Sequence, residues 1–581
     1  MRLRISLRHV LTGAALLLLT PVAETKQQGH TQTVTGVVNN GVQQRLELQV
    51  MQTQNPDQFN LYLLGLREFM AMDQNNPISY YQIAGIHGRP YIAWDGWTSA
   101  AGPGGYGGGY ACHVSNIFLP WHRPYLAFFE QQLYNHVQNV ANSFPASSRA
   151  RWQSAATNFR IPYWDWAAAP SPDCQVFPNI LSTQTITLTT PTGLKKLPNP
   201  LYSYDFHPLV ASDMAISPYT QWKTTVRDPT GWTASGVSQN GVVGSSLSRV
   251  RSSLTQRVYN LFTGCSNFTR FSNEAWQGTD KLVGADSLES IHDVIHTTVG
   301  SNGHMTYFSY SAFDPIFWLH HANVDRLWAM WSEINPNTYV QTARAGHPTF
   351  TWPTGTAIDA NFGLVPWAKS RAGALYTSND VRGTDIFGYT YPETAEGFNA
   401  TSVKKAVNSL YGNDANQHAI KAPVQSSSYQ YIANFVSQKM QLSGSYAIYV
   451  FLGKPGANPQ HWPTASNLVG THAVTADFNV ETTEAAVMDL PVTGTVPLTD
   501  ALQAKVNQNQ LASMDMGPVE TYLQQHLNWR ISLYDGTVVP ASKVPGFSIS
   551  VVASEMQPAA AADEFPTWGP FISLSNATFS G

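Results

Sequence analysis

The segment "FDPIFWLHHANVDRLW", residues 313–328, places two histidines, His320 and His321, side by side in an apolar stretch. Neighbouring residues on an α-helix point about 100° apart, so both imidazoles cannot easily serve one site. A single histidine in an apolar helix is usually a core residue with a satisfied hydrogen bond. Whether this segment packs a core or holds a functional group therefore depends on the rest of the chain.

A second segment, "SLESIHDVIH", carries two histidines one helical turn apart. His292 and His296 stand at i and i+4, so both project from one face of the predicted helix. Ser287 and Glu289 are favourable residues for its start. This spacing is typical of two ligands on one metal ion, although it also arises by chance. Together with residues 313–328, it predicts a three-histidine site.

The third ligand of this site is predicted from the position of a carboxylate. A ligating imidazole usually donates its other N–H to a carboxylate or carbonyl group. Asp325 stands at i+4 from His321 and at i+5 from His320, so we expect Asp325 to orient His321. Phe317, at i−4, lies on the same face and forms an apolar wall. We therefore predict that His321 is the ligand and that His320 supports packing.

Three further histidines lie upstream, in "YYQIAGIHGRP" and "CHVSNIFLPWHRPYLAFFE". They are His87, His113 and His122, and a predicted helix runs from His122 through Glu130. Each histidine alone is more often structural, but together they form a second trio without a cysteine or carboxylate ligand. Such imidazole sites suit copper and zinc, whereas di-iron bundles use Glu-x-x-His pairs. The residues alone therefore leave a paired copper site or a zinc site open.

Composition and charge restrict the class of protein. The 581 residues are 43% hydrophobic and only 12% charged, with a formal net charge of −4. The length suffices for at least two domains, and the lack of a basic block argues against a nucleic-acid partner. The apolar run from Val10 to about Leu19 follows three arginines, which is the layout of a secretory signal peptide and short for a membrane span. We expect a secreted protein that does not span a membrane.

Three sequons fit a secreted chain, although such triplets often arise by chance, whereas the odd number of cysteines needs another explanation. The three sequons begin at Asn267, Asn399 and Asn576. The three cysteines are Cys112, Cys174 and Cys265. Because the count is odd, at least one sulfur has no disulfide partner within the chain, and only a Cys174–Cys265 pair stands out as a candidate.

The pattern of the chain changes near residue 391. Helical periodicity dominates to about residue 335, whereas residues 445–453, 528–539 and 546–554 read as strands, with a hairpin turn at Asp535-Gly536. The fold class is therefore a mainly α domain followed by a smaller β-rich, sandwich-like domain. The predicted segments are a signal peptide (1–23), the helical domain (24–391), a linker (392–428), the β-rich domain (429–556) and a poorly ordered tail (557–581).

Taken together, the histidine motifs resemble those of the type-3 copper proteins, closest to the fungal tyrosinases and polyphenol oxidases. "HVSNIFLPWHRPYLAFFE" resembles the first copper signature of that family, and "DPIFWLHHANVD" the second, whose ligand falls on His321. "SLESIH" and "YYQIAGIHG" resemble the segments around other ligands. The resemblance covers about residues 87–328 and implies a four-helix-bundle core with two copper ions. One copper would be held by His87, His113 and His122, and the other by His292, His296 and His321.

The resemblance also implies an activity. Dioxygen would bind between the copper ions, and o-diphenols would be oxidised to o-quinones, with hydroxylation of monophenols left open. Glu289 matches the family glutamate that holds a water and takes the phenol proton, and we expect it to be ionised beside two copper ions. Asp293 stands where relatives that are strong on monophenols often have asparagine. The residues that fall at the substrate entrance are Thr297, Met305, Phe308 and Phe317.

The β-rich segment resembles the C-terminal shielding domain of latent fungal enzymes. In those enzymes an aromatic side chain plugs the entrance until a protease acts. Phe451 is the candidate plug, with an ordinary sheet-core role as the alternative, and Lys404-Lys405 is the candidate cleavage site. "FGYTYP" resembles the tyrosine pair that closes the catalytic domain, at Tyr389 and Tyr391. We expect a monomer or homodimer that is activated by a protease.

The sequence departs from the fungal pattern at one ligand. Relatives usually have Cys-x-His there, with a thioether between the cysteine and the histidine, whereas here Ala111 holds the cysteine position and Cys112 directly precedes His113. Cys112 is therefore either a free thiol or bonded in another way. The rival functions are a haemocyanin-like oxygen carrier, which shares the dicopper site, and a zinc hydrolase that uses one histidine trio.

Overall fold

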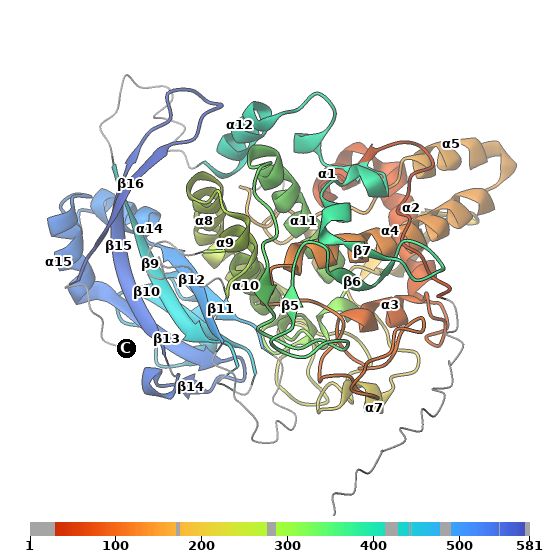
Figure 1. The fold of residues 1–581 in the computed structure, drawn as a ribbon, viewed down its shortest axis with the longest axis horizontal. Helices are drawn as coiled ribbons and strands as arrows, with labels where there is room; N and C mark the ends of the chain where they lie inside the picture. Colours follow the sequence, from red (N-terminus) through yellow and green to blue (C-terminus); the bar gives the residue numbers. More distant parts are fainter. Residues whose placement is uncertain are drawn as a thin grey trace, which may run out of the picture.

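The computed structural model describes residues 30–169, 175–275, 286–412, 428–440, 442, 444–476, 490–544 and 546–575. A helical part and a β-rich part lie side by side in Figure 1. The predicted signal peptide, Cys174 and Asn576 fall outside the described residues. None of the helices in the described ranges is both long and apolar enough to cross a membrane.

The helical part contains the segments with the histidine motifs. Its helices are α1 (Leu48–Gln54), α2 (Pro56–Met70), α3 (Tyr80–His87), α4 (Phe118–Ser143), α5 (Ala146–Thr157), α6 (Asn179–Ser182), α7 (Ala211–Met214), α8 (Asn240–Gly264), α9 (Phe268–Ser272), α10 (Leu288–Gly300), α11 (Ile316–Ile334) and α12 (Ala400–Tyr411). Short paired strands lie between them: β1 (Gln43–Gln44), β2 (Thr185–Thr190), β3 (Gly193–Pro198), β4 (Ala343–Arg344), β5 (Ala357–Ile358), β6 (Gly363–Ala368), β7 (Leu375–Thr377) and β8 (Tyr389–Thr390).

Five helices pack against one another in the centre of the helical part. Helix α4 packs against α2 and α11, and α10 packs against α8 and α11. The predicted start of α10 is confirmed, because the Ser287 hydroxyl oxygen accepts the N–H of Ser290 at 3.1 Å. Most residues of α10 and of the first four turns of α11 are buried. Helices that are buried on nearly all sides lie in the middle of a large core, and this is the position of both helices.

A buried charge cluster, which we call the arginine cluster, ties the two ends of the helical part together. Its ionic members are Arg45, Arg123, Glu130 and Asp325. Arg45 Nε donates to Glu130 at 3.0 Å, and Arg123 Nε donates to Asp325 Oδ1 at 2.7 Å. The hydroxyl groups of Tyr389 and Tyr391 each donate to Asp325 Oδ2 at 2.7 Å. The tyrosine pair thus joins the chain after the helices to α4 and α11.

The β-rich part is a sandwich of two four-stranded antiparallel sheets. One sheet has the order β11-β10-β13-β14 and the other β12-β9-β15-β16. The strands are β9 (Ser428–Gln438), β10 (Tyr446–Leu452), β11 (Leu468–Val474), β12 (Pro491–Pro497), β13 (Leu527–Leu533), β14 (Val538–Val539), β15 (Ser548–Gln557) and β16 (Thr567–Ser573), with α14 (Thr499–Asn507) and α15 (Met516–His526) beside them. The hairpin turn predicted at Asp535-Gly536 is confirmed between β13 and β14.

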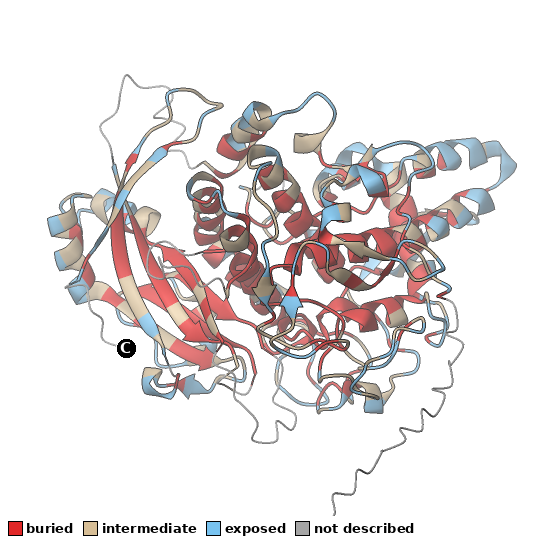
Figure 2. Cartoon of the chain, in the orientation of Figure 1, coloured by how far each residue is buried: buried red, intermediate tan, exposed pale blue. Residues whose placement is uncertain are grey.

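Strand β10 contributes to two cores at once. Ile448 and Val450 belong to the core of the sandwich, whereas Tyr449 and Phe451 belong to the core of the helical part. This alternation follows from the two-residue period of a strand whose faces are both covered. Helices α8 and α10 contact β11, and Figure 2 shows buried residues continuing from these helices into the neighbouring strands.

Two details of the predicted chain organisation differ from the structure. The predicted linker contains helix α12, which buries Val403, Val407 and Tyr411 and packs against α8 and α11. The pair Lys404-Lys405 lies within this helix, so a protease would have to unfold it to cut there. The predicted poorly ordered tail is wrong over β16, because this strand pairs with β15 and Trp568 Nε1 donates to Thr263 at 3.0 Å.

Candidate metal centre

The first histidine trio comes from α3, the segment after it and α4. The three rings offer nitrogen atoms within 4.8 Å of one another, and all three are buried: His87, His113 and His122. The Nδ1–H of His87 donates to Phe308 O at 2.9 Å, and that of His122 donates to Phe118 O at 2.8 Å. These bonds place the ring proton of His87 and of His122 on Nδ1, so the Nε2 atom of each of these two rings carries a lone pair. All three Nε2 atoms are buried without a hydrogen-bond partner in the described part of the chain.

The second group lies on α10 and α11. His321 Nε2 is 3.2 Å from His292 Nε2 and 3.2 Å from His296 Nε2. The Nδ1 of His296 faces Met305 O at 2.7 Å, and the Nδ1 of His292 faces Asp293 Oδ1 at 3.0 Å. Because both of these Nδ1 atoms face acceptors, both carry the proton, and each Nε2 is a lone-pair donor. His321 has at most one Nε2 proton for two such lone pairs.

This donor set fits metal ions. Nitrogen ligands about 2.0 Å from a metal at tetrahedral angles stand about 3.3 Å apart, close to the spacing of the second group. Burial lowers the pKa of His122 to about 3 and lowers the pKa values of His87, His113, His296 and His321 well below their usual range. Neutral imidazoles with buried, unpaired lone pairs are what copper and zinc require of a protein.

The two groups form one centre. The ring of His122 stacks on that of His321 with centroids 4.7 Å apart. Phe317 stands 4.1 Å from His321 and 4.9 Å from His87, centroid to centroid. The predicted apolar wall is therefore present, and it contacts both groups. Two metal ions held by these groups would be neighbours in one buried region.

The expected role of Asp325 as the partner of His321 is wrong, although the choice of His321 fits the geometry. Asp325 accepts its hydrogen bonds from Arg45, Arg123 and the tyrosine pair, and His321 Nδ1 has no partner among the described residues. The carboxylate of Asp325 binds two guanidinium groups rather than a neutral imidazole, because hydrogen bonds between opposite charges are stronger. His320 lies in the same group of four histidines and stacks on His292 at 5.0 Å.

Glu289 is held by two backbone groups. Its carboxylate accepts the N–H of Val114 at 2.6 Å and the N–H of Glu274 at 3.2 Å. Val114 follows His113 and has a φ of 52°, a conformation that β-branched residues rarely adopt. Burial and the nearby Glu274 raise the pKa of Glu289 well above its usual value. The ionised carboxylate that we expected would require the positive charge of nearby metal ions.

Asp293 links the second histidine group to the β-rich part. One carboxylate oxygen, Oδ1, accepts from His292, and the other, Oδ2, accepts from the backbone and side chain of Thr475 at 3.1 and 2.5 Å. Lys439 Nζ also donates to Oδ2, at 3.2 Å. Burial alone would raise the pKa of Asp293, but Lys439 and the bond from His292 hold it below its usual value.

Two buried charged residues near Asp293 carry no signal in the sequence. Glu274 and Lys439 are both fully buried and form an ion pair across the two parts of the molecule. Burial raises the pKa of Glu274 to about 8 despite this pair. Neither residue lies in a recognisable motif, because the pairing joins positions that are 165 residues apart. We call Glu274, Glu289, Asp293 and Lys439 the carboxylate cluster.

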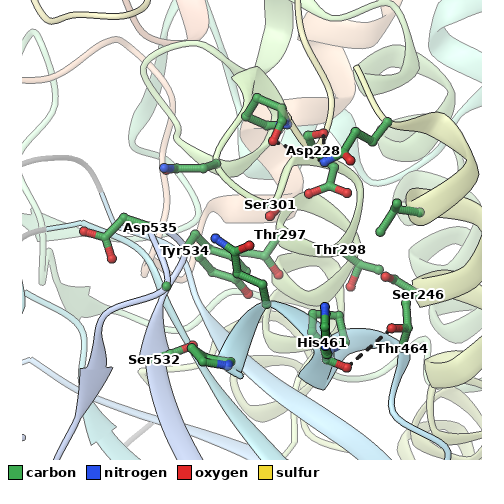
Figure 3. Close-up of a pocket in the computed structure, with 18 of the residues that line it drawn as sticks. Asp228, Ser246, Thr297, Thr298, Ser301, His461, Thr464, Ser532, Tyr534 and Asp535 are labelled. Atoms are coloured by element: carbon green, nitrogen blue, oxygen red, sulfur yellow. Dashed lines mark hydrogen bonds between the residues drawn. The ribbon is translucent and has the colours of Figure 1, made fainter. Parts of the chain in front are cut away.

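The four predicted entrance residues lie around the histidines. Phe308 stacks on His113 with centroids 3.8 Å apart, and the carbonyl groups of Phe308 and Met305 orient His87 and His296. Thr297 follows His296 and lines a cavity of about 850 Å³ between α8, α10 and the β-rich part. Figure 3 shows Thr297 beside Tyr534 in this cavity. The predicted site histidines do not line it.

Phe451 is buried without the contacts of the predicted plug, whereas Cys112 is a free thiol, one of the two states predicted for it. The ring contact described for Phe451 is with Trp462, at 6.1 Å, and none is with a site histidine. The plug role therefore has no contact in its favour, and the sheet-core alternative matches the position. Cys112 is a free thiol whose Sγ donates to Tyr110 O at 3.7 Å. Burial raises its pKa well above the usual value.

Comparison with known proteins matches both parts of the chain. The model of the common central domain of tyrosinase matches residues 77–334, and the model of the tyrosinase C-terminal domain matches residues 430–551. Tyrosinase of Neurospora crassa is 32% identical, over 89% of this chain and 92% of that protein. Tyrosinase of Podospora anserina is 34% identical, over 80% of this chain and 93% of that protein.

Solved structures match as well. A structure of latent and active mushroom tyrosinase has a TM-score of 0.79 at 25% identity and covers 93% of this chain and 98% of that one. Pro-tyrosinase of Aspergillus oryzae has a TM-score of 0.72 at 20% identity, over 93% of this chain and 98% of that one, and supports the fold alone.

Proposed function

Because the chain belongs to the tyrosinase family, it is a dicopper phenol oxidase, and we propose that it is a secreted, latent enzyme that oxidises o-diphenols to o-quinones with dioxygen. The observation that carries this proposal is the convergence of buried imidazole lone pairs in two adjoining groups. Copper ions bound there would supply the binding and reduction of dioxygen. The six proposed ligands are His87, His113, His122, His292, His296 and His321.

The residues around the ligands have separate roles in this proposal. Asp293 accepts the Nδ1–H of His292 and so keeps the Nε2 of that ring directed into the centre. The carbonyl groups of Phe308, Phe118 and Met305 do the same for three other rings. Glu289 is the buried carboxylate positioned to accept the proton of a phenol, because its backbone bonds hold it in place. Phe317 and Phe308 exclude water and stack against a flat substrate.

The β-rich part supports the proposal of latency. Its residues Lys439, Thr475 and Ser445 bond to Asp293 and to the backbone of Thr306, beside the second histidine group. While these contacts persist, a substrate cannot approach Asp293 from that side. An activating cut would separate the two parts. Because α12 holds Lys404 and Lys405, we place the cut in the polar sequence after it, within 413–428.

Oxygen uptake tests this proposal. The full chain is loaded with copper and assayed intact and after limited proteolysis, with catechol and with phenol. We expect little uptake by the intact chain, a large rise with catechol after cleavage, and a smaller rate with phenol. Equal rates before and after cleavage would refute latency. Reversible oxygen binding without turnover in either form would instead favour an oxygen carrier.

Secretion is proposed from the sequence alone. The apolar run after three arginines and the sequons at Asn267 and Asn399 support it. Both asparagines start helices and accept a backbone N–H through Oδ1, which leaves Nδ2 as the group that a glycan would modify. Expression of the full chain in a fungal host, with assay of the medium and of the N-terminal residue, tests this. Retention inside the cell with an intact N-terminus would contradict it.

A further inference from the structure

The ammonium group of Lys439 is enclosed by side chains of both parts of the molecule beside the metal centre, and we call this enclosure the pocket. Lys439 follows strand β9 and is fully buried. Its Nζ donates to the carboxylate of Glu274, to Asp293 Oδ2 at 3.2 Å and to Thr475 Oγ1 at 3.3 Å. It also lies 5.1 Å from the centroid of the Phe308 ring, within the range of a cation–π interaction. Two carboxylates and an aromatic face thus surround one cation.

The walls of this pocket belong mainly to the helical part, whereas the cation belongs to the β-rich part. Glu274 precedes α10, Asp293 lies within α10, and Phe308 lies between α10 and α11. The second carboxylate oxygen of Glu274, Oε2, is buried and has no partner in the described ranges of the chain. Glu289 adds a third carboxylate nearby. Without Lys439 the pocket would hold buried negative charge with no neighbouring ammonium, which is costly unless another cation enters.

The pocket adjoins both histidine groups. Asp293 Oδ1 accepts the Nδ1–H of His292, so one imidazole ring separates this carboxylate from the proposed ligand atom. The ring of Phe308 stacks on His113 at 3.8 Å, which brings the other wall against the first group. The site of Lys439 Nζ therefore lies beside the place between the two groups where a phenol would bind.

We propose that Glu274, Asp293 and Phe308 form a subsite for the ammonium group of phenolic substrates with a short aminoalkyl chain. Lys439 fills this subsite in the intact chain as a built-in ammonium ligand. The proposal rests on the function proposed above, because a phenol reaches the subsite only when the β-rich part is displaced, whereas a small cation can fill the space that Lys439 leaves in a variant with a truncated side chain. Charge-assisted hydrogen bonds in a buried site select strongly between charged and neutral partners, so the subsite would favour cationic over neutral and anionic phenols.

A substrate series of fixed size and varying charge tests the preference. Copper-loaded full chain is cleaved by limited proteolysis and assayed by oxygen uptake with dopamine, 4-(2-hydroxyethyl)catechol and 3,4-dihydroxyphenylacetate. These catechols carry a cationic, a neutral and an anionic group at the end of a short side chain. We expect kcat/KM for dopamine to exceed that for the neutral catechol about tenfold or more, as one charged hydrogen bond allows. The anionic catechol should be the slowest.

Variants assign the preference to the pocket. Glu274→Gln should reduce the ratio of dopamine to neutral catechol towards one, because the amide keeps the shape and loses the charge. Glu333→Gln, an exposed position at the end of α11, is the matched control and should keep the wild-type ratio. Equal kcat/KM values for all three catechols in the cleaved wild type would overturn the subsite. A preference that Glu274→Gln leaves unchanged would also overturn it.

A thermal-shift experiment tests the same pocket without turnover. The full-length, metal-free variant Lys439→Ala lacks the ammonium group, so its Tm should be lower than that of the wild type. Added ethylammonium should restore part of this loss in Tm. Added ethanol, which carries no charge, should not. The control Lys454→Ala, at an exposed position of the same domain, should show neither effect. No specific response of Lys439→Ala to ethylammonium would count against the subsite. If Lys439→Ala does not fold, the substrate series decides.

The two experiments separate this inference from the proposed function. If the cleaved wild type oxidises none of the catechols, the proposed function fails, and the thermal shift still tests the pocket. If it oxidises all three equally well, the function stands and only the subsite is refuted.

Discussion

The arginine cluster and the carboxylate cluster are both buried, but their charges balance differently. The arginine cluster pairs two guanidinium groups with two carboxylates, those of Arg45, Arg123, Glu130 and Asp325. The carboxylate cluster sets three carboxylates against one ammonium group, those of Glu274, Glu289, Asp293 and Lys439. The first lies wholly within the helical part, whereas the second takes its cation from the β-rich part.

This difference in charge balance indicates the role of each cluster. A buried cluster whose opposite charges balance adds little electrostatic demand to its surroundings, which suits a structural role. The carboxylate cluster has three carboxyl groups for one ammonium group, and burial raises the pKa values of Glu274 and Glu289, so the protonation of this cluster responds to a nearby metal ion or a movable cation, which suits a functional site. The position of the carboxylate cluster beside both histidine groups agrees with that division.

Removing a carboxylate from the balanced cluster should have the largest effect on stability. Asp325→Ala leaves Arg45 and Arg123 without their shared partner and removes two tyrosine hydrogen bonds. We expect a loss of about 3–5 kcal/mol in the free energy of unfolding, because a buried charge is left uncompensated. Equilibrium denaturation of the metal-free chain measures this. A loss below about 1 kcal/mol would show that the cluster is not a structural centre.

The two clusters should respond to pH in opposite directions. In the metal-free chain, the pKa of Glu274 is raised to about 8, so its contribution to stability is present at low pH and is lost as the pH rises towards 8. The pKa of Asp325 is held below its usual value by Arg123 and Arg45 against the effect of burial, so its contribution is lost only in acid, as the pH falls through the lowered pKa.

The comparison with Glu274→Gln isolates the first response. Between about pH 4.5 and 8, the free energy of unfolding of the wild type should fall relative to that of the variant by up to about 1.4 kcal/mol per pH unit. Denaturation curves of both metal-free proteins at several pH values measure the difference. If the wild type instead gained stability relative to the variant as the pH rose, the raised pKa of Glu274 would be contradicted.

An exposed ion pair provides the smallest effect. Lys369 and Asp380 stand 2.8 Å apart with side chains 37% and 34% exposed. Lys369→Met should therefore change the free energy of unfolding by less than about 1 kcal/mol, because solvent screens the pair. The same denaturation experiment checks this. A loss as large as that of Asp325→Ala would mean that burial does not explain the difference between these pairs.

The sequence predicts the architecture well where local signals exist. Ser287 starts α10 as expected, and Asp535-Gly536 turns between β13 and β14, because caps and turns act over a few residues. The local sequence pattern did not predict helix α12 or strand β16. Each of these two segments is stabilised by packing or pairing with residues far away in the chain, such as Trp568 with Thr263.

The same limit applies to the site. The spacing of His292 and His296 predicts one face of a helix, and the structure brings them to His321. The partner of Asp325 was predicted wrongly, because helical spacing cannot show that Arg45 and Arg123 compete for it. Glu274 and Lys439 had no signal, since an ion pair between distant segments leaves no local pattern.

Counting bound copper tests the central claim, that the two histidine groups hold two metal ions. Metal analysis of the purified, copper-loaded full chain should give two copper ions per chain in the wild type and in His320→Ala. His321→Ala should retain one copper ion per chain. This substitution removes the ring whose Nε2 faces both His292 and His296, and it leaves the first histidine trio intact. One copper or none in the wild type, or an equal loss in both variants, would contradict the claim.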